Sequence, residues 1–299
     1  MKKLEIILAT ICFFSMTALS FSQQLPISSQ FYWNDYVTNP AYTGMKETPI
    51  IMASVRSQWV GFEGAPGTYT LGGHGFLNKQ KMGLGGMVFN DDRGGAISQT
   101  GVMLNYSYLV EMNEKSYLSF GIAGMFNQYA YDGSDITLFT QDPYLTGSAK
   151  QIVPDINFGV LFMYEKILQV GVSVNQLIGS RLKKLNDFNP IYISDNRLIR
   201  HYQLTATYKV DINENIDIEP YMLLRSTFVN PIQFELGTRS VFKNRYFAGF
   251  GFRYQDAFTV MAGVNKNQFT LGYSYDLTTS KLRNYSTGSH EIMLAFRLK

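Results

Sequence analysis

The ten residues Gln268–Leu277, QFTLGYSYDL, decide the fold of this chain. One set of alternate positions is apolar or aromatic and the other is small or polar: Phe269, Leu271, Tyr273, Tyr275 and Leu277 alternate with Gln268, Thr270, Gly272, Ser274 and Asp276. Successive side chains of a strand point to opposite faces, so this stretch predicts a strand with one apolar and one polar face. The pattern recurs along most of the chain. Such repetition predicts a sheet whose apolar face meets hydrocarbon rather than water.

The composition favours membrane strands over membrane helices. Only 16% of the 299 residues are charged, whereas 15% are aromatic and 26 residues are glycine. Soluble domains usually contain about 25% charged residues. No run of about 20 apolar residues follows the N-terminal region, so no transmembrane helix is expected.

Residues 50–299 are predicted to form an all-β fold, a transmembrane antiparallel β-barrel of the outer-membrane type with about fourteen strands. Each predicted strand alternates apolar residues with polar residues or glycines. The predicted strands are 50–60, 66–77, 81–90, 97–110, 115–131, 152–164, 167–176, 200–210, 216–228, 231–241, 245–254, 257–265, 268–278 and 288–298.

The lengths of the connections test this strand assignment independently. Outer-membrane barrels have short periplasmic turns and longer outer loops. With both barrel ends in the periplasm, alternate connections are all short, and the two longest, 132–151 and 177–199, lie on the outer side. A secreted β-sandwich or jelly roll is the alternative. It would need one solvated face on each sheet, which does not account for glycine-rich polar rows beside aromatic rows with few charges.

Residues 1–22 are predicted to be a secretory signal peptide. Lys2 and Lys3 precede an apolar run, and small residues follow it, so cleavage is expected after Ser22, with Ser20 as the alternative. Cys12 is the only cysteine and lies in the apolar run, so no disulfide or thiol chemistry is expected in the mature chain. The mature charge is close to neutral, which argues against a nucleic-acid partner.

Residues 23–49 form a separate segment before the barrel. They do not alternate, yet they are too aromatic for a solvated tail, with Phe31, Trp33 and Tyr36 among their side chains. Two alternatives follow: the segment plugs the barrel lumen, or it contacts a periplasmic partner.

Charged residues of both signs fall on the inward row of the predicted strands. They include Arg56, Arg225, Glu235, Arg239, Arg253, Asp276 and Glu291, and also Lys209, Glu219 and Arg297. One interpretation is a structural ion-pair network that fixes strand register. The other is the selectivity lining of an open pore, although such linings tend to carry rings of one sign.

Catalytic and metal-binding patterns are weak in this sequence. His74, His201 and His290 lie far apart, without metal-ligand spacing. Ser289 and His290 are neighbours on a predicted strand, so they point to opposite faces and cannot form a nucleophile–base pair. We therefore expect no enzyme activity, no cofactor and no metal.

Several short motifs, in order, resemble one family. Asn39-Pro40-Ala41 with Gly44 comes first, and the segments 56–59, 64–68, 273–276 and 288–292 complete the resemblance over essentially the whole mature chain. The chain is similar to the PorP/SprF family of outer-membrane proteins of the type IX secretion system of Bacteroidota. This resemblance implies a barrel among outer-membrane lipids that works with that machinery. Some family members are required for secretion or surface retention of large adhesins, including those used in gliding. Others associate with periplasmic lipoproteins and peptidoglycan-binding proteins.

The two long outer loops are the expected partner-binding region, because mobile loops on a rigid scaffold commonly carry binding residues. We expect them to hold the C-terminal sorting domain of a secreted cargo, or else merely to cover the barrel mouth. The candidate residues are Asp135, Asp142, Tyr144 and Leu145 in the first loop and Arg181, Lys183, Lys184, Phe188 and Tyr192 in the second. The alternative function is a porin or a channel for hydrophobic compounds.

Overall fold

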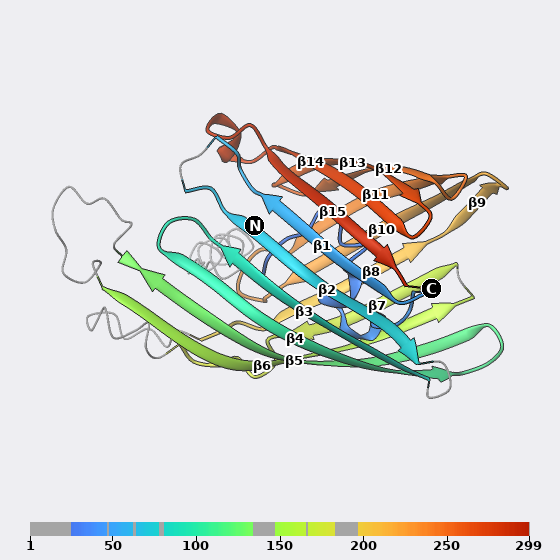
Figure 1. The fold of residues 1–299 in the computed structure, drawn as a ribbon, viewed down its shortest axis with the longest axis horizontal. Coiled ribbons are helices and arrows are strands. Elements are labelled where there is room, and N and C mark those ends of the chain that lie inside the picture. The colour runs from blue at the N-terminus through green and yellow to red at the C-terminus, as the bar shows by residue number, and fades with distance from the viewer. Residues whose placement is uncertain are drawn as a thin grey trace, which may run out of the picture.

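The computed structural model describes residues 25–46, 48–61, 64–77, 81–133, 147–165, 167–182 and 197–298. From residue 50 onward this part of the chain is built mainly of long strands (Figure 1). The strands are β1 (Ile50–Ser57), β2 (Gly67–Leu77), β3 (Met82–Asp92), β4 (Ile97–Glu111), β5 (Ser116–Asp132), β6 (Ser148–Tyr164), β7 (Leu168–Asn175), β8 (His201–Tyr208), β9 (Val210–Asn213), β10 (Ile216–Ser226), β11 (Gln233–Phe242), β12 (Tyr246–Arg253), β13 (Ala257–Lys266), β14 (Phe269–Thr278) and β15 (Ser289–Arg297). The short helical turns are α2 (Asp35–Thr38), η1 (Pro40–Tyr42) and η4 (Lys281–Asn284).

The strands form one closed antiparallel ring. Neighbours in sequence pair with one another, and β15 pairs with β1 to close the barrel. Strands β8 and β9 both pair with β10, Thr207 opposite Tyr221 and Val210 opposite Ile218, so they form a single strand interrupted at Lys209. The barrel therefore has fourteen strands, which confirms the predicted fold class and strand number.

The predicted strand ends differ most at β6. It begins at Ser148 rather than at the predicted residue 152, because residues 148–151 pair in register with the end of β5. Their sequence, SAKQ, has little intrinsic preference for a strand. Pairing with an existing neighbour decides strand formation here, since β-propensity depends strongly on context.

The apolar rows face outward, as the alternation predicted. In β14, Phe269 is 53% exposed and Leu271 is 49% exposed, whereas Thr270 and Ser274 are buried inside the barrel. Such a surface is the lipid-facing surface of an outer-membrane barrel. Among the described residues, no helix is long and apolar enough to cross a membrane.

The two ends of the barrel differ in their connections. The turns after β2, β4, β6, β9, β11 and β13 each span two to four residues, and they lie at the end where β1 begins and β15 ends. The two longest connections join strand ends that lie at the opposite end: β5 ends at Asp132 and β6 begins at Ser148, and β7 ends at Asn175 and β8 begins at His201. By the usual arrangement, the short-turn end is periplasmic and the long-loop end is outer.

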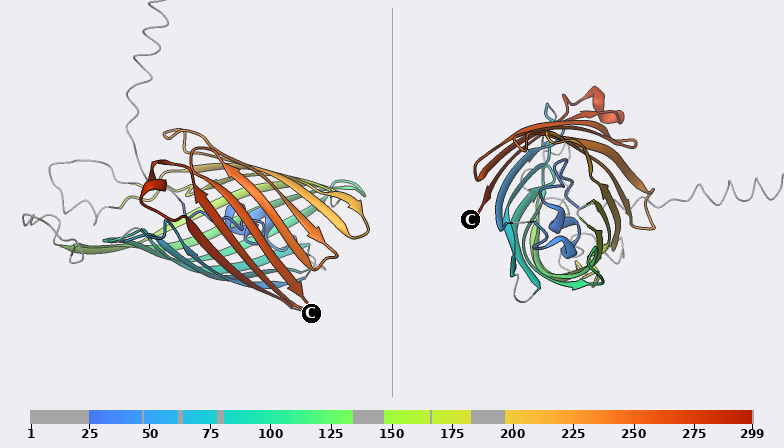
Figure 2. Two further views of the ribbon diagram at one scale, coloured as in Figure 1. Left: turned by 90° about the horizontal axis from the view of Figure 1, so that it is seen from above. Right: turned by 90° about the vertical axis from the view of Figure 1, so that its right-hand side faces the viewer.

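The interior of the barrel contains the start of the described chain (Figure 2). We call residues 25–46 the luminal segment; it includes α2 and η1. The hydrophobic core lies between this segment and the inner wall, with Tyr36, Ala41 and Tyr42 packed in one cluster with wall residues such as Met103 and Leu161. The barrel core is therefore a strand wall packed around a separate piece of the same chain.

Candidate functional site: the luminal segment and its ion cluster

Aromatic side chains attach the luminal segment to the wall. Phe31, Trp33 and Tyr36, the three residues singled out in the sequence, are all buried. The Phe31 ring lies 5.1 Å from the Tyr221 ring, and the Trp33 ring lies 5.7 Å from the ring of Phe247, both as centroid distances. These rings have little exposure to either side of the membrane.

Inward-facing glycines of the wall make room for the segment. A Cβ atom on Gly159 would lie 1.9 Å from Asn39 Oδ1, and one on Gly121 would lie 2.2 Å from the backbone nitrogen of Ala41. A Cβ on Gly83 would lie 2.1 Å from the Thr43 carbonyl oxygen. The glycines in the polar rows therefore allow two backbones to approach closely, a usual role of glycine within strands.

We predict that Gly159→Ala destabilises the protein by about 1–3 kcal/mol, because the added methyl group must displace Asn39 from a well-packed site. Urea unfolding of the purified barrel in detergent micelles, followed by tryptophan fluorescence, measures this change. Gly124→Ala is the matched control, since a Cβ on the outward-facing Gly124 meets no atom within 4 Å. Equal stability of the two variants would contradict the close approach.

Wall side chains satisfy the backbone of the irregular segment. The Asn39 side chain accepts a hydrogen bond from the Ala41 N–H (2.9 Å) and donates to the Val160 carbonyl of β6 (3.2 Å). Ser119 Oγ donates to the Ala41 carbonyl (2.8 Å), and the Gly44 N–H donates to Nδ1 of His74 (2.8 Å). Buried backbone groups need such partners, so Ser119 and His74 of the wall, together with Asn39 of the segment itself, help to fix the path of the segment.

One ion pair lies within the luminal segment itself. Lys46 Nζ is 2.5 Å from a carboxylate oxygen of Asp35 and also donates to the Tyr32 carbonyl (2.9 Å). Burial raises the pKa of the Asp35 carboxyl group, and Lys46 acts against that shift. The pair holds the end of the segment near the start of α2.

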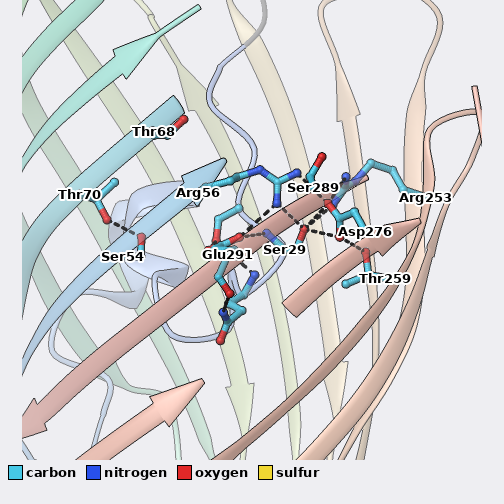
Figure 3. A network of polar contacts seen from close by, with 12 residues as sticks. Ser29, Ser54, Arg56, Thr68, Thr70, Arg253, Thr259, Asp276, Ser289 and Glu291 are labelled. Atoms are coloured by element: carbon cyan, nitrogen blue, oxygen red, sulfur yellow. Dashed lines mark hydrogen bonds and ion pairs between the residues drawn. The ribbon is translucent and has the colours of Figure 1, made fainter. Parts of the chain in front are cut away.

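Charged side chains of β1, β11, β12, β14 and β15 gather on the inner wall of the barrel, and Figure 3 shows those of β1, β12, β14 and β15. Arg56 lies 2.7 Å from Asp276 and 3.3 Å from Glu291, and Arg253 lies 2.9 Å from Glu235. We call these five residues the ion cluster. All five side chains are buried.

Ser29 of the luminal segment lies at the centre of the ion cluster. Its backbone N–H donates to the Glu291 carboxylate (2.8 Å), and its hydroxyl donates to Asp276 (2.7 Å) while accepting from Arg56 (2.9 Å). Ser28 Oγ also donates to Glu291 (2.6 Å). These serines could not be identified from the sequence, because the segment has no periodicity that would place them. The cluster thus joins the segment to the barrel closure.

The three other predicted luminal arginines lie outside the ion cluster. Arg297 donates to the Asn265 side chain (3.4 Å), and its guanidinium lies over the Trp33 ring at 5.8 Å. Arg239 pairs with Glu219, and its guanidinium lies over the Tyr32 ring at 4.9 Å and the Trp33 ring at 5.5 Å. Arg225 donates to the Gln233 side chain at 3.3 Å.

Two cavities border the luminal segment. The outer cavity, of about 560 Å³, is lined by Leu25 and Ser28 and by residues of the outer connections such as Trp59 and Pro231. The periplasmic cavity, of about 160 Å³, is lined by Lys46 and by wall residues near the short turns. The segment therefore enters from the outer half of the lumen and leaves at the periplasmic end, where the Leu298 N–H donates to the Pro49 carbonyl (2.8 Å).

Most of the predicted outer-loop residues lie outside the described residues: Asp135, Asp142, Tyr144, Leu145, Lys183, Lys184, Phe188 and Tyr192. Arg181 is described. It pairs with Arg197 in an isolated bridge, and its carbonyl accepts from the Gln151 side chain (2.9 Å). Next to this bridge, Leu182 and Leu198 are buried in a small apolar cluster, so the base of the second outer loop packs on the barrel rim.

Within the described ranges, no group of three or more histidine, cysteine or acidic side chains could hold a metal ion. His290 contacts Tyr273 (2.7 Å) on the outer surface, whereas Ser289 and Glu291 are buried. The three consecutive residues therefore do not converge. The absence of enzyme activity stays a prediction.

The chain matches known proteins in sequence and in fold. The family model "Type IX secretion system membrane protein PorP/SprF" matches residues 20–296, and no curated relative matches. A FadL homologue of Pseudomonas aeruginosa has a similar fold with a TM-score of 0.54 at 10% identity, over 94% of this chain and 97% of that one. Omp33 of Acinetobacter baumannii is also similar, with a TM-score of 0.49 at 10% identity over 86% of this chain and 100% of that one. The CymD monoaromatic hydrocarbon channel has a TM-score of 0.49 at 10% identity over 92% of this chain and 94% of that one.

The FadL homologue supports the fold alone, and the family match spans nearly the whole chain. A closed ring of strands with an apolar exterior is the form in which a sheet spans the outer membrane. The protein is thus an outer-membrane β-barrel, and the chain belongs to the PorP/SprF family of type IX secretion system membrane proteins.

Proposed function

We propose that this barrel assists the secretion or surface anchoring of a large cargo protein or adhesin and does not conduct solutes. The observation that carries the proposal is the luminal segment, whose buried side chains pack against the wall between the outer cavity and the periplasmic cavity. A secretion partner that holds a cargo needs a rigid scaffold in the membrane but no open passage. The family membership gives the machinery with which it works.

The luminal segment acts as a plug in this proposal rather than as a docking site. Phe31, Trp33 and Tyr36 are buried against the wall, so a periplasmic protein would have little access to them. Any link to a periplasmic lipoprotein or peptidoglycan-binding protein would use the periplasmic turns instead. One such surface is the β9–β10 hairpin, where Ile212 is exposed.

The outer loops hold the cargo in this proposal. The second loop is supported at its base by the Arg181–Arg197 bridge and by the buried Leu182 and Leu198. A rigid base positions the loop residues, and candidates such as Lys184 and Tyr192 would bind the C-terminal sorting domain of the cargo.

Deletion of residues 182–192 is expected to remove most of the cargo from the cell surface while the barrel remains at its normal level. The loop would lose its contacts with the cargo, but the strand ring would be intact. Protease accessibility of the cargo on whole cells measures the effect, and immunoblotting of outer membranes controls for barrel level. Unchanged surface cargo at a normal barrel level would reject the loop assignment.

A porin or a channel for hydrophobic compounds is the second candidate. The outer cavity favours it, since about 560 Å³ falls within the usual range of small-molecule sites. Conduction would require displacement of the luminal segment. Planar-bilayer recordings distinguish the two functions.

A further inference from the structure

The outer cavity has the size and position of a ligand site. It opens among the outer connections, and its inner boundary includes Phe31, Asn34 and Thr38 of the luminal segment. A ligand that entered from the outside would stop at this segment.

One wall of the outer cavity is a row of methionines. Met87 on β3 lies directly opposite Met103 on β4, and Met103 lies directly opposite Met125 on β5. Phe89 lines the cavity beside them. Methionine side chains are flexible and polarisable, so such a surface accepts apolar side chains of varied shape.

The wall formed by β8, β10 and β11 presents a guanidinium without a carboxylate partner. Arg225 lies in register between Gln203 and Gln233, and its hydrogen bond goes to the Gln233 amide oxygen. Among the described residues, Arg56, Arg239 and Arg253 each pair with carboxylates, whereas Arg225 pairs with none. Glu235 and Asp256, the nearby acids, are engaged by Arg253. A partly buried cation in this setting favours an anionic group.

Two buried amides complete the polar part of the cavity lining. Asn175 is 2% exposed and Gln203 is 7% exposed, and both line the cavity. No donor of the described chain reaches Asn175 Oδ1 or Gln203 Oε1. Buried acceptors need hydrogen-bond donors. A peptide offers backbone N–H donors, apolar side chains and a carboxylate in one ligand, whereas a fatty acid lacks the N–H donors.

We propose that the outer cavity receives an extended peptide segment that presents a carboxylate to Arg225 and apolar side chains to the methionine row. This inference rests on the proposed function, because it identifies which part of a secreted protein enters the barrel. The carboxylate comes from the C-terminus of that segment or from an acidic side chain, and the chemistry at Arg225 is the same in both cases.

The test uses purified mature protein in detergent and a library of N-acetylated hexapeptides, each made with a free C-terminal carboxylate and with a C-terminal amide. Captured peptides are identified by mass spectrometry. We expect capture of peptides that carry a carboxylate and apolar residues, and Arg225→Gln is expected to reduce it about tenfold or more. Arg297→Gln is the matched control, because Arg297 is also an inward arginine but lies at the periplasmic end and does not line the outer cavity.

The results of this test show where the carboxylate comes from and whether a peptide binds at all. Capture of free-carboxylate peptides alone identifies a chain terminus, and capture of amidated peptides that contain aspartate or glutamate identifies an acidic side chain. No capture, equal capture by folded Arg225→Gln, or complete displacement by laurate would overturn the inference. The proposed function is tested separately: the deletion of residues 182–192 measures the amount of cargo on the cell surface, and its result does not depend on peptide capture.

Discussion

Removal of residues 25–46 is expected to turn a barrel that does not conduct ions into one that does. In the protein that keeps residues 25–46, the luminal segment lies between the outer cavity and the periplasmic cavity. Without the segment, the fourteen-strand ring encloses a continuous water-filled lumen, and we expect bilayer conductance about tenfold or more above the leak of the complete protein. Planar lipid bilayers containing each purified protein measure the difference.

The shortened chain is expected to fold, because its strand ring closes without the segment. The deletion ends before β1, and the β1–β15 pairing extends from Ile50 to Ser57. Heat-modifiable migration on gels checks that the barrel forms. Addition of a synthetic peptide of residues 25–46 is expected to lower the conductance of the shortened barrel to the level of the protein that keeps the segment. Equal conductance of the complete and shortened proteins would show that the segment does not close the lumen, and it would favour the channel function.

Side-chain alternation made most of the barrel predictable. A period of two residues assigns every strand position to the inside or the outside, so the inward position of Arg56, Asp276 and Glu291 followed from the sequence alone. Their proximity also followed, because a closed barrel must pair its last strand with its first. These three residues do meet in the ion cluster.

The sequence alone did not predict which of the other luminal charges pair with one another. Glu219 and Arg239 are directly opposite, as are Glu235 and Arg253, and these pairs depend on the register of three neighbouring strands. A shift of one residue would have turned each side chain to the other face. Alternation places residues on a face, but the turns between strands set which residues meet.

The path of the luminal segment through the barrel also could not be predicted from the sequence. Its aromatic content indicated burial, yet nothing periodic placed Ser29 among the charges or Asn39 between β6 and β7. The inward glycines of the wall supported the prediction of a barrel, but their contact with the luminal segment was not inferred from them. Glycine-rich inward rows suggested a barrel, and their actual role at Gly121 and Gly159 is to admit another backbone.

Arg253→Leu is expected to destabilise the protein by about 3–5 kcal/mol, the usual cost of removing one partner from a buried ion pair. Arg253 is 1% exposed and contacts Glu235, Asp256 and Asp276, so its loss leaves carboxylates in a buried site with too little positive charge. Urea unfolding in detergent micelles measures the loss. Lys115→Met, which breaks the exposed pair with Glu165, is the control and is expected to change the stability little.

A second substitution separates the charge effect from the loss of packing. In Arg253→Leu/Glu235→Leu, the closest carboxylate partner is also removed, so part of the lost stability is expected to return. The coupling between the two sites then reports how strongly the buried pair interacts. If the double variant were less stable than Arg253→Leu by the full cost of Glu235→Leu alone, the two side chains would be acting independently. In that case the ion cluster would be a set of separately solvated charges, and Ser29 would have no fixed network to bind.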